Sequence, residues 1–309
     1  MRTDEALKAV FRALLETMLD HEAGVRAGGD AEALHDYRVA VRRTRSGLAQ
    51  LPGVFPRQIV RRFKHGFSWL GERTAPLRDL DVHRLALPRF REWLGRDLGR
   101  ALDPVERELR ELHAREHREL AAAFESRRYA MLCASWSEFL AAPVPARTTL
   151  RNARRPVVDV AIERIDRAAE RVLRKGDAIG PDSLPGDLHR VRIECKKLRY
   201  LLEFFAALLP EREVERVVEA LRTLQNDLGE HQDLTVQRDF LLGLESRYAG
   251  PERVATREAA AHLVRRIDEL LAGRREAFRT HFAAFRRPAL EGALRYIGLA
   301  AGSSSSNAV

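Results

Sequence analysis

The sequence is poor in cysteine and in long apolar runs. Its 309 residues include two cysteines, Cys133 and Cys195, and neither belongs to a CxxC pair or to a histidine cluster. A disulfide framework and a zinc site are therefore not expected. No apolar run approaches the roughly 20 residues needed to cross a bilayer, and residues 1–11 lack the apolar core of a signal peptide. We expect a cytoplasmic protein that does not enter a membrane.

Aromatic residues are also scarce, at 7% of the chain. Proteins that bind single-stranded nucleic acid interleave aromatic rings with basic residues so that bases can stack. Here Tyr37, Phe63 and Phe67 fall on the apolar side of expected helices, with Tyr200 as the exception. The pattern argues against a base-stacking platform, whereas binding to the backbone of duplex nucleic acid stays open.

The chain is rich in Arg, Ala, Leu and Glu. Hydrophobic residues make up 45% of it and charged residues 32%, which is typical of long helices with charged outer faces. The sequence therefore predicts an all-α protein. Its formal charge of +9 favours a polyanionic partner such as nucleic acid, a phosphate polymer or an acidic membrane surface.

A basic stripe is encoded in Leu34–Leu48, which reads LHDYRVAVRRTRSGL. In an α-helix, spacings of three, four and three residues place four side chains on one face, namely His35, Arg38, Arg42 and Arg45. We call these four the first basic stripe; Arg43 lies beside it. Apolar residues of the same segment recur on a neighbouring face that can pack into a core. The stripe is about 15 Å long at the helical rise, so it suits several consecutive phosphates better than one small anion.

More basic residues follow in the next expected helix, which starts after Pro56. They are Arg57, Arg61, Arg62 and Lys64. Between Tyr37 and Gly71 the chain has eight Lys or Arg residues and no Asp or Glu. Ordinary surface helices alternate both signs of charge. The imbalance therefore favours a binding surface over a solvated basic face.

Hydrophobic periodicity and helix-breaking residues divide the rest of the chain. The expected helices cover residues 5–23, 30–51, 57–70, 88–98, 104–124, 127–140, 258–271, 276–285 and 288–299, and residues 75–85 form a separate segment opened by proline. Residues 141–156 lose periodicity and gain proline, which indicates a linker. We divide the chain into a first half at 1–142, a linker at 143–157, a second half at 158–299 and a disordered tail at 300–309.

The second half repeats the first at an offset of 154 residues, which places His35 on His189. At this offset 12 of the 49 positions from Leu34 to Val82 are identical. The repeat carries a second basic stripe of His189, Arg192, Lys196 and Arg199, with Lys197 beside it. We therefore predict two pseudo-symmetric antiparallel helical bundles that arose by internal duplication, with both stripes lining a shared groove.

The repeat departs from the first half in one respect. Where the first half has Arg57 and Arg61 after its proline, the second half has Glu211 and Glu215. A contribution of these positions to anion binding is therefore not expected in the second half.

The duplicated pattern resembles the CHAD family, the conserved histidine α-helical domain. In that family each of two helical halves has a histidine that opens a helix with regularly spaced Arg or Lys, which is matched by HDYRVAVRRTR at His35–Arg45 and HRVRIECKKLR at His189–Arg199. RDLDV at Arg78–Val82 and QDLTV at Gln232–Val236 are also similar to the family pattern. The resemblance covers residues 5–299 and implies non-catalytic binding of inorganic polyphosphate in a basic central groove. Members are often fused to a CYTH-type triphosphatase domain, whose alternating Glu and Lys strands are not found here, so we expect a stand-alone copy.

We predict that polyphosphate, or phosphate and sulfate as small mimics, binds ten residues of the two halves. They are His35, Arg38, Arg42, Arg43, Arg45, His189, Arg192, Lys196, Lys197 and Arg199. We expect no cofactor, no metal and no catalytic residue, and the oligomeric state is left open. We extend the hypothesis to recruitment of the protein to intracellular polyphosphate granules. Each histidine could instead cap its helix or form a hydrogen bond within its bundle.

Three aspartates keep a second function open. Asp79, Asp81 and Asp233 could hold a divalent metal in a phosphohydrolase that acts on phosphate polymers, or they could pair with arginines of the stripes or cap a helix. A protein that binds the phosphate backbone of nucleic acid is the third and weaker hypothesis.

Overall fold

The structure is a computed structural model that describes residues 1–28, 30–180, 182–248 and 253–286. Within these residues the regular structure is helical and there is no β-strand; one isolated bridge pairs Arg2 with Pro156. The all-α prediction is confirmed. The helix expected at 288–299 and the tail at 300–309 lie outside the described residues.

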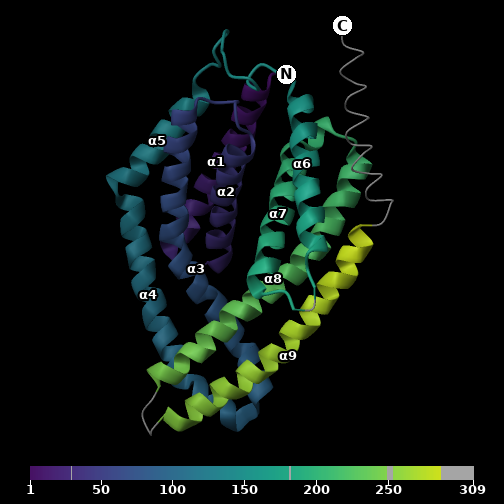
Figure 1. The fold of residues 1–309 in the computed structure, drawn as a ribbon. Helices are drawn as coiled ribbons and strands as arrows, with labels where there is room; N and C mark the ends of the chain where they lie inside the picture. Colours follow the sequence, from purple (N-terminus) through teal and green to yellow (C-terminus); the bar gives the residue numbers. More distant parts are fainter. Residues whose placement is uncertain (29, 181, 249–252, 287–309) are drawn as a thin grey trace.

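Figure 1 shows the arrangement of the helices. In chain order they are α1 (Thr3–Ala27), α2 (Ala31–Gln50), α3 (Arg57–Gly99), η1 (Arg100–Leu102), α4 (Asp103–Glu125), α5 (Arg127–Ala141), α6 (Val157–Asp177), α7 (Pro185–Phe204), η2 (Ala206–Leu208), α8 (Glu211–Arg247) and α9 (Val254–Phe285). The first basic stripe lies on α2, which begins where predicted because the Asp30 carboxylate accepts hydrogen bonds from the backbone N–H groups of Glu32 and Ala33. The second basic stripe lies on α7.

Helix α3 is longer than the sequence indicated. We expected a helix at 57–70, a separate segment at 75–85 and another helix at 88–98, but α3 runs through all three and includes Pro76 and Pro88. A proline inside a helix costs about 3 kcal/mol. Residues on both sides of Pro88, such as Leu77, Leu87 and Phe90, are buried, and their packing offsets this cost. The helical dihedral angles are interrupted at Gly95 instead, where φ is 73°.

Helix α9 likewise joins two segments that we expected to be separate, 258–271 and 276–285. Gly273, between them, costs only about 1 kcal/mol relative to alanine in a helix. Ile267 and Phe278 are buried on either side of it, so their packing stabilises a continuous helix through Gly273.

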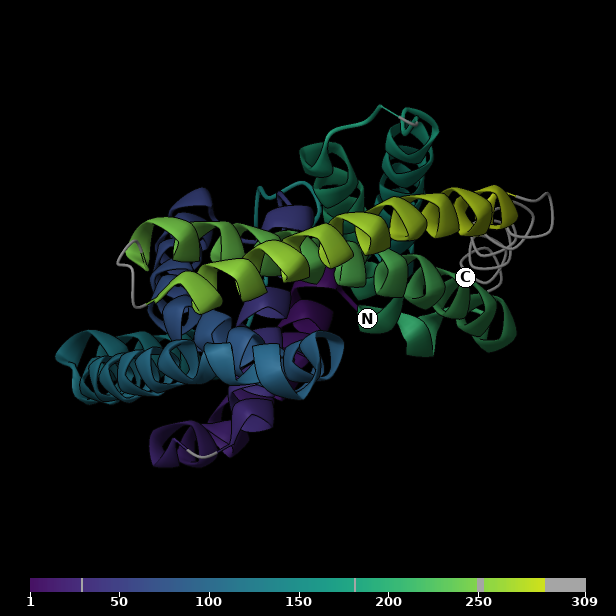
Figure 2. The same ribbon diagram turned by 90° about the horizontal axis from the view of Figure 1, so that it is seen from below.

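Two hydrophobic clusters hold the helices together. The larger one takes residues from both sides of the predicted linker, including α1, α2, α5, α6, α7 and the first part of α8. The smaller one joins the second part of α3 to α4, α9 and the second part of α8. Figures 1 and 2 show α8 and α9 crossing the molecule side by side to reach the lower end of α3. The boundaries that we assigned to the two halves stay a prediction.

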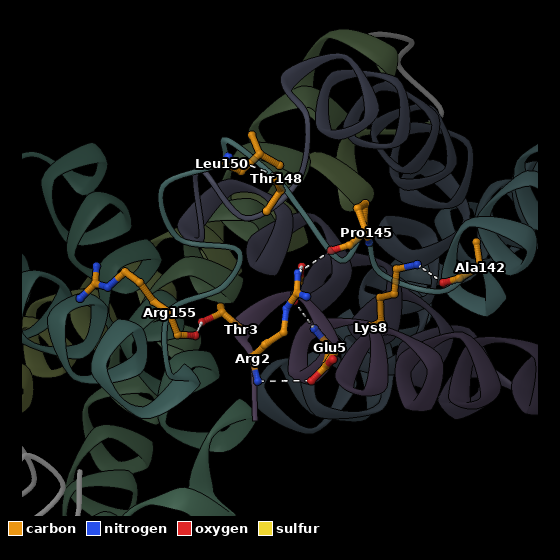
Figure 3. Close-up of polar contacts among 10 residues, drawn as sticks. Arg2, Thr3, Glu5, Lys8, Ala142, Pro145, Thr148, Leu150 and Arg155 are labelled. Carbon is orange, nitrogen blue, oxygen red and sulfur yellow. Dashed lines mark hydrogen bonds and ion pairs between the residues drawn. The ribbon is translucent and has the colours of Figure 1, made fainter. Parts of the chain in front are cut away.

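The segment predicted as a linker is bound to the start of α1. The backbone N–H groups of Thr3 and Asp4 donate to the carbonyls of Arg155 and Ala153, each at 3.1 Å. Figure 3 shows the Arg2 guanidinium reaching the Pro145 carbonyl, at 2.9 Å. Because these contacts are regular backbone and charge-assisted bonds, the segment packs as part of the fold rather than as a free spacer.

Trp136 on α5 is the aromatic centre of the larger cluster. It is 0% exposed, and its ring centroid lies 4.5 Å from that of Phe63 and 5.3 Å from that of Phe11. We expect Trp136→Ala to lower the free energy of unfolding by about 3–5 kcal/mol, because it leaves a cavity among rings that cannot collapse. Denaturant titration measures this. Met131→Ala on the same helix, at a side chain that is 55% exposed, should change stability by no more than about 0.5 kcal/mol; similar losses for both variants would contradict this account of the core.

Candidate functional site

The two basic stripes meet where α2 and α7 lie side by side (Figure 1). Arg42 Nε of α2 donates a 3.0 Å hydrogen bond to the Tyr200 hydroxyl of α7. Gln50 Nε2 donates to the Lys197 carbonyl at 3.3 Å. The stripes therefore belong to one surface built by both helices.

Lys196 stands at the centre of this surface. Its pKa is lowered to about 7, first by desolvation and then by the nearby charges of Arg42, Arg192 and Arg199, while Asp233 opposes the shift. One of these arginines comes from the first stripe and two from the second. The fold thus holds desolvated positive charges of α2 and α7 close together, where they repel one another. A bound anion would remove this electrostatic repulsion.

Two arginines, one from each stripe, share a similar environment. Arg38 Nη1 donates to the Thr74 hydroxyl at 2.6 Å and to the Gly71 carbonyl at 3.0 Å. Desolvation lowers its pKa to about 10, and Asp79 opposes the shift. Desolvation also lowers the pKa of Arg192, and Asp233 opposes that shift.

The pKa values of Asp79 and Asp233 are shifted in the opposite direction from those of the arginines. Desolvation raises the pKa of Asp79, and Arg38 and Arg78 oppose it. The pKa of Asp233 is raised for the same reason and opposed first by Arg192. Both carboxylates are therefore near arginines that can neutralise them.

Asp81 is not part of this arrangement. Asp81 is 5% exposed and projects from the other side of α3. Its Oδ1 lies 2.9 Å from His113 Nε2 of α4. Among the described residues, no group of three His, Cys, Asp or Glu side chains is placed to hold a metal ion. The structure does not bring the three candidate aspartates together as one metal site.

The two histidines differ. Desolvation and then the charge of Arg78 lower the pKa of His35, so it is neutral at pH 7 and can donate one hydrogen bond to an anion. His189 is exposed, and its Nδ1 lies 2.6 Å from Gln232 Oε1. That contact holds the His189 ring beside α8.

Arg43 and Lys197 lie beside the stripes, as the helical spacing predicted. Arg43 Nη2 forms an ion pair with Glu203 at 2.9 Å, and its guanidinium lies 5.6 Å from the centroid of the Tyr200 ring. Lys197 Nζ is 3.2 Å from the buried carboxylate of Glu194. Both side chains have structural partners, and their role in binding stays a prediction.

Below the stripes, α3 and α8 converge. His83 stacks on Phe240 with ring centroids 4.1 Å apart, and Arg89 donates to Gln237 at 2.9 Å. These contacts join α3 to α8 below the two stripes.

A family model for the CHAD domain matches residues 9–242, which include both stripes. The chain belongs to the CHAD family. The fold agrees with it: the crystal structure of the CHAD domain from the plant Ricinus communis superimposes with a TM-score of 0.76 at 26% identity, over 93% of each chain. PptA from Streptomyces chartreusis has the same fold, with a TM-score of 0.66 at 19% identity over 92% of this chain and 100% of that one.

A curated relative is the uncharacterized Mycobacterium tuberculosis protein Rv2226. It is 28% identical over 243 residues, which are 74% of this chain and 43% of the relative. The chain therefore aligns with less than half of that relative's length. No helix in the described part of this CHAD protein is long and apolar enough to cross a bilayer.

One residue near the two stripes was missed by the sequence reasoning. Arg78 on α3 influences the pKa values of His35, Asp79 and Asp233, so it lies among groups from α2, α3 and α8. The sequence shows it only as the first letter of RDLDV. Its spacing of seven residues from Gly71, which contacts Arg38, could have placed it on the face of α3 that meets the first stripe.

Proposed function

We propose that this protein binds linear inorganic polyphosphate, without catalysis, in the groove between α2 and α7. The observation that carries the proposal is the cluster of Lys196 with Arg42, Arg192 and Arg199, in which desolvation and like charges lower the pKa of the lysine to about 7. A fold that served only its own stability would not gather these cations. A chain of phosphates would supply about one negative charge for each of them and accept bonds from the forked guanidinium groups.

A ligand without bases suits the site better than nucleic acid does. Tyr200 was the aromatic residue that could have stacked on a base, but it is 2% exposed and accepts the hydrogen bond from Arg42. Asp79 and Asp233 lie beside arginines rather than in a metal cluster of the described residues, which supports binding over hydrolysis.

We also propose that the two halves arose by duplication and are related by a pseudo-two-fold axis. In support, equivalent positions at the 154-residue offset have equivalent neighbours: Arg38 is close to Asp79, and Arg192 is close to Asp233. His35 likewise lies near Arg78, and His189 near its counterpart Gln232. Recruitment of the protein to polyphosphate granules in the cell would follow from the same binding.

The proposal is tested by calorimetric titration with polyphosphate, alongside two competing assays. We expect saturable binding, no release of phosphate in the presence of Mg²⁺ or Mn²⁺, and weaker binding to duplex DNA at the same salt concentration. Phosphate release that is lost in Asp79→Asn would instead identify a phosphohydrolase. Equal competition by duplex DNA would identify a protein that binds nucleic-acid backbones.

Binding should depend on pH through Lys196. With its pKa near 7, the free lysine is protonated below pH 7 and must take up a proton on binding above it. Affinity for a long polyphosphate is thus expected to fall by about tenfold or more between pH 6.5 and 8.5, since one pKa unit is worth about 1.4 kcal/mol. Titrations across this range in constant salt measure the effect.

Lys196→Arg is the matched variant for this test. Arginine stays protonated throughout the range, so the variant should bind with little dependence on pH. If Lys196→Arg keeps the full pH dependence of the unchanged protein, the titrating group is not Lys196.

A further inference from the structure

The first part of α3 carries basic residues that lead away from the first stripe. Positions 57, 61, 64, 68, 71 and 78 recur at helical spacing and share one face of α3. Arg38 bonds to the Gly71 carbonyl on this face, and Arg45 Nη1 lies 3.0 Å from where a Cβ atom at Gly71 would be. Cations that precede Gly71 on the same face therefore continue the basic surface of the stripe. Those cations are Arg57, Arg61 and Lys64, which we call the α3 extension.

A cavity of about 660 Å³ lies at the end of this surface, between α2, α3 and residues 149–151. All three residues of the α3 extension line it, together with Arg151. Ala49, the next position on the face of the first stripe after Arg45, also lines it. The cavity thus lies between α2 and α3 at the end of the first stripe.

The basic side chains of the cavity are exposed and available. Arg57, Arg61 and Lys64 are all exposed, and none of the ion pairs found among the described residues involves them or Arg151. By contrast, Arg43 and Lys197 beside the stripes are each paired with a glutamate. An anion that enters the cavity would not have to displace a carboxylate.

The wall opposite the α3 extension is fixed in place. The Asn152 side chain, which is 5% exposed, donates from Nδ2 to the Pro52 carbonyl at 2.8 Å. Its backbone N–H donates to the Gly53 carbonyl at 3.0 Å, at a turn where Gly53 has a φ of 76°. Figure 3 shows Leu150 held by the Thr148 hydroxyl next to this point, at 3.2 Å. The cavity is therefore formed before any ligand arrives.

The second half has no equivalent of the α3 extension. At the 154-residue offset, Arg57 becomes Glu211, Arg61 becomes Glu215 and Lys64 becomes Val218, which is buried. The first turns of α8 carry three glutamates and two arginines and so have no net positive charge, whereas the first turns of α3 carry basic residues alone and attract a polyanion. The two halves therefore match at their stripes but not at the first turns of α3 and α8.

We propose that a polyphosphate chain held by the two stripes continues along the α3 extension into this cavity and does not continue along α8. The proposal rests on the function proposed above and adds a preferred path to it. A short polyphosphate fits within the stripes alone, whereas a long one also occupies the cavity. The α3 extension would therefore make the protein bind long chains more tightly than short ones.

The test compares two variants that change the net charge equally and have the same helical spacing. Arg57→Glu with Arg61→Glu removes the α3 extension, and Arg212→Glu with Arg216→Glu makes the same change at exposed positions of α8. The first variant should lose about tenfold in affinity for a polyphosphate of some tens of phosphates and bind tripolyphosphate as the unchanged protein does. The second variant should bind both ligands almost normally. Arg57→Lys with Arg61→Lys should restore the affinity for long chains, and circular dichroism confirms that each variant is folded.

The outcomes separate this inference from the proposed function. If the unchanged protein binds long polyphosphate but the two glutamate variants bind it equally well, the path along α3 is wrong and the groove proposal stands. An equal loss of tripolyphosphate and long-chain binding in the α3 variant would also overturn the inference, because it would place these arginines within the short-chain site. If the unchanged protein binds no polyphosphate, the proposed function itself fails.

Discussion

Reversing the charges of Arg42 and Lys196 together is expected to weaken polyphosphate binding by about 100-fold or more at low salt. The two residues belong to different stripes, and each lies within the electrostatic reach of the other. Arg42→Glu with Lys196→Glu would place two carboxylates at the centre of the proposed groove, where they would repel the phosphates of the ligand. Both single variants should bind more weakly than the unchanged protein and more tightly than the double variant.

The control for this variant changes the net charge by the same amount elsewhere. Arg107 and Arg118 are exposed on α4, the outer helix at the left of Figure 1. Arg107→Glu with Arg118→Glu should keep the affinity within a few-fold, because exposed charges beyond about 10 Å are screened at 0.1 M salt. If the control loses as much affinity as the groove variant, binding depends on overall charge and not on the stripes.

Salt should have an effect of similar size. A protein that neutralises six to ten phosphates of a nucleic acid loses about 10³–10⁵ in affinity between 50 and 200 mM salt, because bound counterions are released. The two stripes supply six cations that are not histidine: Arg38, Arg42, Arg45, Arg192, Lys196 and Arg199. We therefore expect a loss on the order of 10³-fold over this range, measured by titration in increasing NaCl.

The slope of affinity against salt also identifies the groups involved. The double variant at Arg42 and Lys196 should show a clearly shallower slope than the unchanged protein, since fewer counterions are released. A loss of less than tenfold between 50 and 200 mM NaCl, or an unchanged slope in the double variant, would contradict an electrostatic groove.

Much of the fold follows from local sequence. Helices α2, α4 and α5 begin and end close to where capping residues and periodicity placed them, and Asp30 caps α2 as expected. The errors are at Pro76, Pro88 and Gly273, where a local helix breaker is outweighed by packing that involves distant helices. A reading of short windows cannot weigh such tertiary contacts.

The candidate site was predictable in part. Helical spacing was enough to group each basic stripe and to place Arg43 and Lys197 beside it. The lowered pKa of Lys196 could not be predicted, since it depends on how closely α7 approaches α2 and on burial by the rest of the bundle. The neighbours of Arg78 on α2 and α8 also depend on tertiary packing, although its spacing from Gly71 places it on the face of α3 that meets the first stripe.

The central claim is that the two stripes together hold one polyphosphate chain. Calorimetric titration with polyphosphates of graded length tests it most directly, because it gives affinity and stoichiometry in one experiment. We predict one bound chain per protein, with affinity that rises steeply as the ligand becomes long enough to reach both stripes and more gradually as it fills the cavity at α3. Two independent sites per protein, or an affinity that does not change with chain length, would contradict the shared groove.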